Sequence, residues 1–162
     1  MEELQGKINY TFKNIDLLKQ AMCSIRLQRT QYDGKNNKEY TNEALALVGD
    51  TLLKTFIANR LYTKILDKGN YPRKGYITIL KAKLESNKIY HKIMQDEGLW
   101  IYAYNEYYFA DQPCMDHERV RSNDHDPYIE AITAAIFYDS DFYETQKWFN
   151  DWLFPLIKKY LD

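Results

Sequence analysis

Cysteine is scarce in this chain of 162 residues, which contains only Cys23 and Cys114. The two thiols lie far apart in the sequence and match none of the close Cys and His spacings that hold zinc. A fold built on a disulfide framework needs more cysteines than two. The composition therefore indicates neither a disulfide framework nor a zinc site, and both thiols are expected to be ordinary buried or surface groups.

Long apolar runs are also absent. No stretch approaches the roughly 18 residues that a bilayer-spanning helix requires. The start of the chain, Met1-Glu2-Glu3, lacks the basic residues and apolar segment of a secretory signal. We therefore expect a cytoplasmic protein without a membrane partner. With 45% hydrophobic residues, the chain is long enough to form one domain over residues 1–162.

The sequence has no excess of positive charge. Its formal net charge is −1, whereas proteins that coat nucleic acids by bulk electrostatics are clearly basic. Any contact with nucleic acid must therefore be local. Lysine and arginine do cluster between residues 64 and 83, where Arg73, Lys74 and Lys81 are candidates for phosphate contacts, although such clusters are also typical of solvated helix faces.

Helical spacing of apolar residues is present along most of the chain. Asn14 is a good N-cap for the first helix, Gly98 is expected to end the third, and Pro155 is expected to kink or divide the last. Residues 26–38 are predicted to form a polar loop and residues 100–121 an irregular segment. The predicted helices, which together make an all-α bundle, cover residues 15–22, 43–64, 78–95, 126–137 and 142–160.

Acidic residues interrupt these apolar helices at a few positions. Glu43 and Asp50 lie two turns apart and share one helix face, and Asp126 lies one turn before Glu130, which precedes a very apolar stretch. A carboxylate on an apolar face is costly unless a cation or a hydrogen-bond donor meets it. If the two helices pack side by side, the four carboxylates converge and favour Mg²⁺. Alternatively, Glu43 is an ordinary first-turn residue and Asp50 lies on a solvated edge.

The sequence around these acids resembles that of the ribonuclease III family. NEALALVGDTLL (residues 42–53) is similar to the family's signature motif, NERLEFLGDAVL, and HDPYIEAITAAIFYDSD (residues 125–141) is similar to its second acidic motif, LADVFEALIGAIYLD. Residues 10–14 resemble the opening pattern of the family, and ITILKAKLESNKIY (residues 77–90) resembles its middle helix. The resemblance therefore covers nearly the whole chain.

This resemblance implies an all-α ribonuclease III-like endonuclease domain that forms a homodimer. It also implies hydrolysis of phosphodiester bonds in double-stranded or structured RNA with Mg²⁺, for which Mn²⁺ can substitute. Lys81 matches a basic position of the middle motif, which implies contact with phosphate or with Glu130. The expected dimer seam on the signature helix consists of Leu47, Val48, Thr51, Leu52 and Thr55.

Position by position, the resemblance assigns Asp50 and Glu130 as the catalytic and metal-binding acids, and Glu43 as the first motif acid. Ala46, however, stands where the family has a metal-binding Glu, and Pro127 stands where it has an Asp. Since alanine carries no ligand atom, reduced activity is expected. The expected metal ligands are Asp50, Glu130, Glu43 and Asp126.

The alternative function is that of a non-catalytic relative, a dimer that keeps the fold and acts as an RNA-binding or structural protein. No tail follows Asp162 that could hold a double-stranded RNA-binding domain, so we expect the chain to lack one. The two functions differ in one assay. An enzyme cuts duplex RNA and loses this activity in the Glu130→Gln variant, whereas a binding protein shifts the mobility of RNA without cutting it.

Overall fold

The computed structural model describes residues 1–23, 27–28, 39–103 and 127–160. In this part of the chain the regular structure is almost entirely helical, which confirms the predicted all-α class. Two short strands, β1 (Leu27–Gln28) and β2 (Glu39–Tyr40), pair antiparallel. The α-helices are α1 (Glu2–Lys7), α2 (Ile15–Ala21), α4 (Glu43–Asp67), α5 (Lys74–Leu84), α6 (Asn87–Asp96), α7 (Tyr128–Asp139), α8 (Phe142–Trp148) and α9 (Phe154–Lys159).

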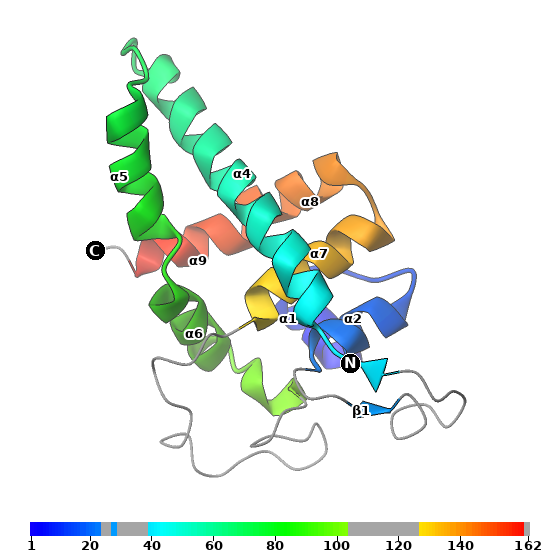
Figure 1. Cartoon of the computed structure of the whole chain (residues 1–162). Helices are drawn as coiled ribbons and strands as arrows, with labels where there is room; N and C mark the ends of the chain where they lie inside the picture. Colours follow the sequence, from blue (N-terminus) through cyan, green and yellow to red (C-terminus); the bar gives the residue numbers. More distant parts are fainter. Residues whose placement is uncertain (24–26, 29–38, 104–126, 161–162) are drawn as a thin grey trace.

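The long helix α4 and the apolar helix α7 form the centre of the fold, with α4 crossing directly over α7 (Figure 1). Every residue of α7 from Tyr128 to Ile136 is buried. On the facing side of α4, Leu53, Phe56 and Ile57 are almost fully buried. Burial of each such side chain contributes roughly 1.5 to 3 kcal/mol, so the α4–α7 contact contributes substantially to hydrophobic stabilisation.

The N-terminal segment is tied to the far end of α7 by one carboxylate. Asp139 accepts hydrogen bonds from the Tyr10 hydroxyl at 3.0 Å and from the backbone N–H groups of Lys13 and Asn14 at 2.9 and 2.7 Å. Asn14 caps α2, as predicted, because its side chain accepts from the Asp16 N–H at 3.2 Å. The short helix α1, which precedes this segment, was not predicted.

The prediction of one helix over residues 78–95 is wrong, because the structure contains two helices there. α5 begins earlier, at Lys74, and α6 starts after an extended residue, Ser86 (φ −89°, ψ 122°). The Ser86 carbonyl accepts from the N–H groups of Ile89 and Tyr90 at 2.8 and 3.2 Å, and so opens a new helix. Serine is common at such positions because it is a weak helix former that favours helix starts.

The other helix ends follow the predicted stop signals more closely. Gly98 lies after α6 with φ +63°, a conformation that favours glycine. Pro155 lies at the start of α9, and a π-helical stretch, η3 (Phe149–Leu153), separates that helix from α8, so the predicted division is confirmed. A proline lacks the N–H that would continue the α-helical ladder. Helix α7 begins at Tyr128, and the predicted cap Asp126 lies outside the described residues.

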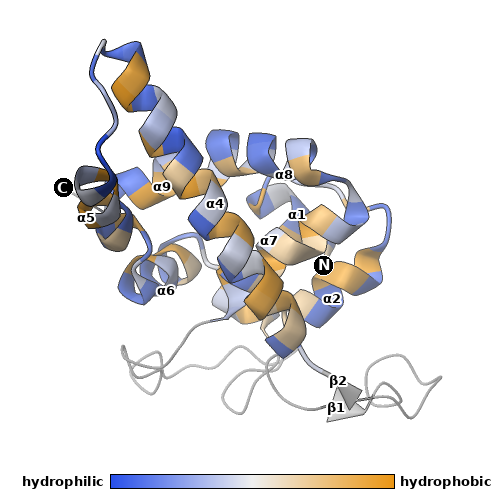
Figure 2. Cartoon of the chain, turned by 45° about the horizontal axis from the view of Figure 1, so that its top comes forward, coloured by the Kyte–Doolittle hydropathy of each residue, from blue (hydrophilic) through white to orange (hydrophobic). Residues whose placement is uncertain are grey.

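The surface of the bundle is largely polar. In Figure 2 the hydrophobic colour gathers where α2, α4 and α7 meet, and the hydrophilic colour covers the outer turns of α8. The far end of α4 extends beyond the rest of the bundle with α5 beside it (Figure 1). Within the described ranges, no helix combines the length and the apolar character that a bilayer-spanning helix needs.

Candidate functional site

The candidate site begins with a very close approach of α4 to α7. A Cβ atom built on Gly49 would lie 1.7 Å from the carbonyl oxygen of Glu130 and 2.5 Å from its carbonyl carbon. Only glycine therefore fits at this position. Because Asp50 is the next residue along α4, the contact places Asp50 beside the first turn of α7, which contains Glu130.

Three carboxylates gather near this contact, from Asp50, Glu85 and Glu130. Glu130 is 3% exposed and Asp50 is half-buried. All three act electrostatically on two common neighbours, Lys54 and Tyr90. Asp50 and Glu130 are thus near enough to act on the same two neighbours, and Glu85, which was not predicted, acts on them as well.

Two lysines partly neutralise this acidic cluster. The Lys54 ammonium donates to Asp50 Oδ2 at 2.5 Å, and Lys81 Nζ lies 2.6 Å from Glu85 Oε1. The hydrogen bond to Asp50 raises the pKa of Lys54, and the three nearby carboxylates add to that rise. Burial raises the pKa of the Tyr90 hydroxyl above its usual range, and the same three charges raise it further. Tyr90 therefore stays protonated beside the acids.

The cluster opens at Asp50 onto a groove of about 680 Å³ between α4 and α5. Lys54 and Lys81 also line this groove, so their ammonium groups are within reach of an anion lying in it. The remaining lining residues, which are mostly small or neutral, are Thr51, Thr55, Ala58, Asn59, Tyr62 and Ile77.

The other predicted site residues lie further from this cluster or outside the described residues. Glu43 is the first residue of α4 and is exposed, and its N–H donates to Thr41 Oγ1 at 3.3 Å. Ala46 is buried, with 6% of its surface exposed. Arg73 and Lys74 are exposed at the start of α5. The fourth predicted metal ligand, Asp126, falls in a segment that the structure does not describe.

The residues of the expected dimer seam form a strip along one side of α4. Leu47 is 71% exposed, an unusual position for a large apolar side chain. Val48 and Leu52 are half-buried against the core, while Thr51 and Thr55 are exposed and donate their hydroxyl hydrogen bonds back to α4 carbonyls. The strip therefore combines one projecting leucine with small polar neighbours.

Carboxylate oxygens are the donors that Mg²⁺ prefers, and Mg²⁺ commonly binds through one or two carboxylates while keeping several waters. Asp50 and Glu130 fit this requirement as a pair. Across the described residues no three His, Cys, Asp or Glu side chains form a group ready to hold a metal ion. Lys54, whose side chain is 47% exposed, would have to move away from Asp50 to admit one.

Sequence reasoning missed Glu85 because it treated residues 78–95 as one helix. On a continuous helix, Glu85 and Lys81 are an ordinary surface pair four residues apart. The only signal in the sequence was that pair, which closes the last turn of α5. The proximity of Glu85 to Asp50 depends on how α5 packs on α4, and this packing is a tertiary property.

No family model matches the chain. The chain is 30% identical to ribonuclease 3 of Fusobacterium nucleatum over 162 residues, which cover 99% of the chain and 62% of that protein. It is 29% identical to ribonuclease 3 of Buchnera aphidicola over 161 residues, which cover 98% and 62%. The chain thus spans less than two thirds of these relatives.

Among solved structures, the nuclease domain of ribonuclease III from Campylobacter jejuni superposes with a TM-score of 0.71 at 21% identity. The superposition covers 98% of the chain and 96% of that domain, which is described as flexible in its region involved in dimer formation. Sequence similarity along almost the entire chain and a shared fold agree with the two motifs that meet at Gly49 and Glu130. The chain is therefore similar in sequence to proteins named ribonuclease 3 along almost its entire length, and it shares the fold of the ribonuclease III nuclease domain.

Proposed function

We propose that this protein is a divalent-metal-dependent endoribonuclease that hydrolyses phosphodiester bonds in double-stranded or structured RNA. The supporting observation is the contact of Gly49 with the Glu130 backbone, because the next residue after Gly49 is Asp50, which lines an open groove. Relatives named ribonuclease 3 support the same activity.

In this proposal Asp50 and Glu130 hold Mg²⁺ with their carboxylate oxygens. When bound there, such an ion would lower the pKa of a bound water and stabilise negative charge on the phosphodiester. Glu130 is held rigidly, because it is buried in the most tightly packed helix. Asp50 is accessible from the groove and can meet both ion and substrate. Lys81, on the groove wall, is placed to contact an RNA phosphate.

Arg73 and Lys74 extend the RNA contact beyond the groove. Both are exposed at the start of α5, where long cationic side chains can reach phosphates without losing their hydration. These contacts set affinity rather than sequence preference, since phosphates are the same at every nucleotide. Ala46 lowers the expected metal affinity, because a water must replace the missing carboxylate.

We also propose that two chains associate through the strip around Leu47. An exposed leucine beside half-buried Val48 and Leu52 is an apolar surface that a second copy can cover. Two copies related by a twofold axis would present two grooves to one duplex, one for each strand. Cleavage of both strands then depends on the dimer.

A specific observation favours the alternative of a non-catalytic RNA-binding or structural dimer. Lys54 and Lys81 already pair with Asp50 and Glu85. Together with the absence of a ligand atom at Ala46, these pairs give two of the three acids a cationic partner without a metal. Under this alternative the groove binds RNA with its lysines, and the acids are structural.

The test is cleavage of duplex RNA by the purified protein with Mg²⁺ or Mn²⁺, compared with Glu130→Gln. This change keeps the shape of a buried side chain and removes its negative charge. The matched control is Glu144→Gln, on the exposed first turn of α8. The enzyme proposal expects cleavage that the control retains and Glu130→Gln loses. RNA binding without cleavage in all three proteins, with either metal, would establish the alternative.

A further inference from the structure

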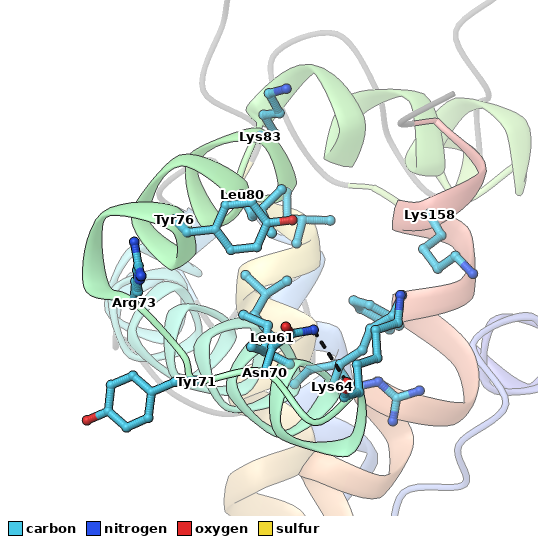
Figure 3. Close-up of a pocket in the computed structure, with 14 residues that line it drawn as sticks. Leu61, Lys64, Asn70, Tyr71, Arg73, Tyr76, Leu80, Lys83 and Lys158 are labelled. Carbon is cyan, nitrogen blue, oxygen red and sulfur yellow. Dashed lines mark hydrogen bonds between the residues drawn. The ribbon is translucent and has the colours of Figure 1, made fainter.

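A second hollow lies on the other side of the α4–α5 pair. It has a volume of about 720 Å³ and is enclosed by the last turns of α4, by α5 and by α9 (Figure 3). Its apolar surface comes from Leu61, Ile65, Leu80, Leu84 and Phe154. The volume lies within the range of roughly 300 to 1,000 Å³ that is usual for small-ligand sites.

The rim of this hollow is strongly and uniformly basic. Six exposed cations line it, and no acidic residue is among its lining residues. Within the described part of the chain none of the six forms a salt bridge, although the Arg60 guanidinium lies 5.0 Å from the centre of the Phe154 ring. In a protein of net charge −1, this is a local concentration of positive charge that favours an anion. The six cations are Arg60, Lys64, Lys68, Arg73, Lys83 and Lys158.

The basic hollow is separate from the groove that contains Asp50. On α5, Ile77 and Lys81 face the groove, whereas Tyr76 and Lys83 face the hollow. The two cavities share no lining residue. A second copy seated on the strip around Leu47 would lie on the groove side of α4, because Thr51 and Thr55 belong both to that strip and to the groove. The hollow therefore needs a different occupant.

The arrangement of side chains indicates what that occupant is. Figure 3 shows Tyr76 and Leu80 projecting from α5 into the hollow, with Lys64 and Lys158 on the opposite wall and Arg73 at the near end of α5. An aromatic ring and an apolar floor suit a nucleobase. Cations spread around the rim suit successive phosphates better than a single phosphate group. Bases in an RNA duplex cannot reach this ring and floor, because they are paired and stacked inside the helix.

We propose that the basic hollow binds a single-stranded RNA segment, with a base against Tyr76 and Leu80 and the flanking phosphates on the rim. The proposal deepens the proposed function and rests on it for RNA as the ligand class. It implies that the protein favours RNA in which a duplex continues into an unpaired tail or loop. Such a segment would be held outside the groove.

The test measures binding of a labelled single-stranded RNA of about ten nucleotides by fluorescence anisotropy. EDTA is present throughout, so cleavage plays no part. The double variant Lys64→Ala/Lys158→Ala should weaken binding about tenfold or more. Because two phosphate contacts are lost, the slope of the logarithm of the binding constant against the logarithm of the salt concentration should become shallower by about 1.4. The matched control, Lys88→Ala/Lys147→Ala, removes two exposed lysines that do not line the hollow and should change the affinity less than about twofold.

A second variant, Tyr76→Ala, distinguishes a base from a phosphate alone. It should weaken single-stranded RNA binding about fivefold or more and leave the affinity for inorganic tripolyphosphate unchanged. The proposal is overturned if the Lys64/Lys158 variant and its control bind single-stranded RNA with equal affinity. It is also overturned if the protein binds tripolyphosphate or a nucleotide tightly while Tyr76→Ala leaves the affinity for single-stranded RNA unchanged. If the protein cleaves duplex RNA while either result holds, only the proposed binding of single-stranded RNA in the hollow is refuted, and the proposed function stands.

Discussion

The close approach at Gly49 can be tested with a single methyl group. In Gly49→Ala the new Cβ atom would lie 1.7 Å from the Glu130 carbonyl oxygen, whereas ordinary contacts begin at 3.4 Å. α4 and α7 would have to separate by about that difference along their main contact. Overpacking of a well-packed core costs roughly 1 to 3 kcal/mol, and a contact this close to backbone atoms belongs at the upper end of that range. Alanine returns about 1 kcal/mol through its higher helix propensity.

We therefore expect Gly49→Ala to lower the free energy of unfolding by about 2 kcal/mol, or the melting temperature by roughly 4 to 8 °C. Urea unfolding followed by circular dichroism measures this change. Cleavage activity should fall further than stability does, since the same displacement moves Asp50 away from Glu130. Metal-dependent activity measured well below the melting temperature separates the two effects.

The matched control is Gly75→Ala, because Gly75 also lies in a helix and a Cβ there meets no atom within 4 Å. It should leave activity unchanged and stabilise the protein by up to about 1 kcal/mol. If Gly49→Ala behaves like this control, with equal or higher stability and full activity, the close packing of the two motifs is refuted.

Three further predictions concern the seam, the missing acid and the N-terminal tie. Leu47→Arg should convert the dimer to a monomer in sedimentation experiments, whereas Leu66→Arg, at the other end of α4, should not; a dimer that persists rules out this seam. Ala46→Glu should bind Mn²⁺ more tightly in calorimetry, and lower stability because position 46 is buried; unchanged affinity would place the metal elsewhere. Asp139→Ala removes three hydrogen bonds and should lower the free energy of unfolding in urea by about 2 kcal/mol. A decrease below about 0.5 kcal/mol would contradict the stabilising role of these hydrogen bonds.

Local signals in the sequence predicted the features that depend on a few neighbouring residues. The Asn14 cap, the Gly98 stop and the division at Pro155 each follow from backbone chemistry that acts within one or two turns. The central pairing of α4 with α7 could also be anticipated, because both helices are apolar over most of their length. Family resemblance then indicated which acids lie at that contact.

Features that depend on the packing of distant segments could not be read from the sequence. The break at Ser86 was missed because serine is tolerated inside helices, and only the extended backbone at that residue separates α5 from α6. Glu85 joins the acidic cluster because α5, which ends at this break, packs on α4. The basic hollow likewise combines Lys64, Lys83 and Lys158 from three helices, so in the sequence these lysines resemble ordinary solvated residues.

The most direct test of the central claim is a crystal structure of the protein soaked with Mn²⁺, with the ion located by its anomalous scattering. We predict one ion that is bound by carboxylate oxygens from both Asp50 and Glu130, and Lys54 displaced from Asp50. An empty site with the Lys54–Asp50 pair intact at saturating Mn²⁺, or an ion bound away from both acids, would contradict the proposed metal-dependent nuclease.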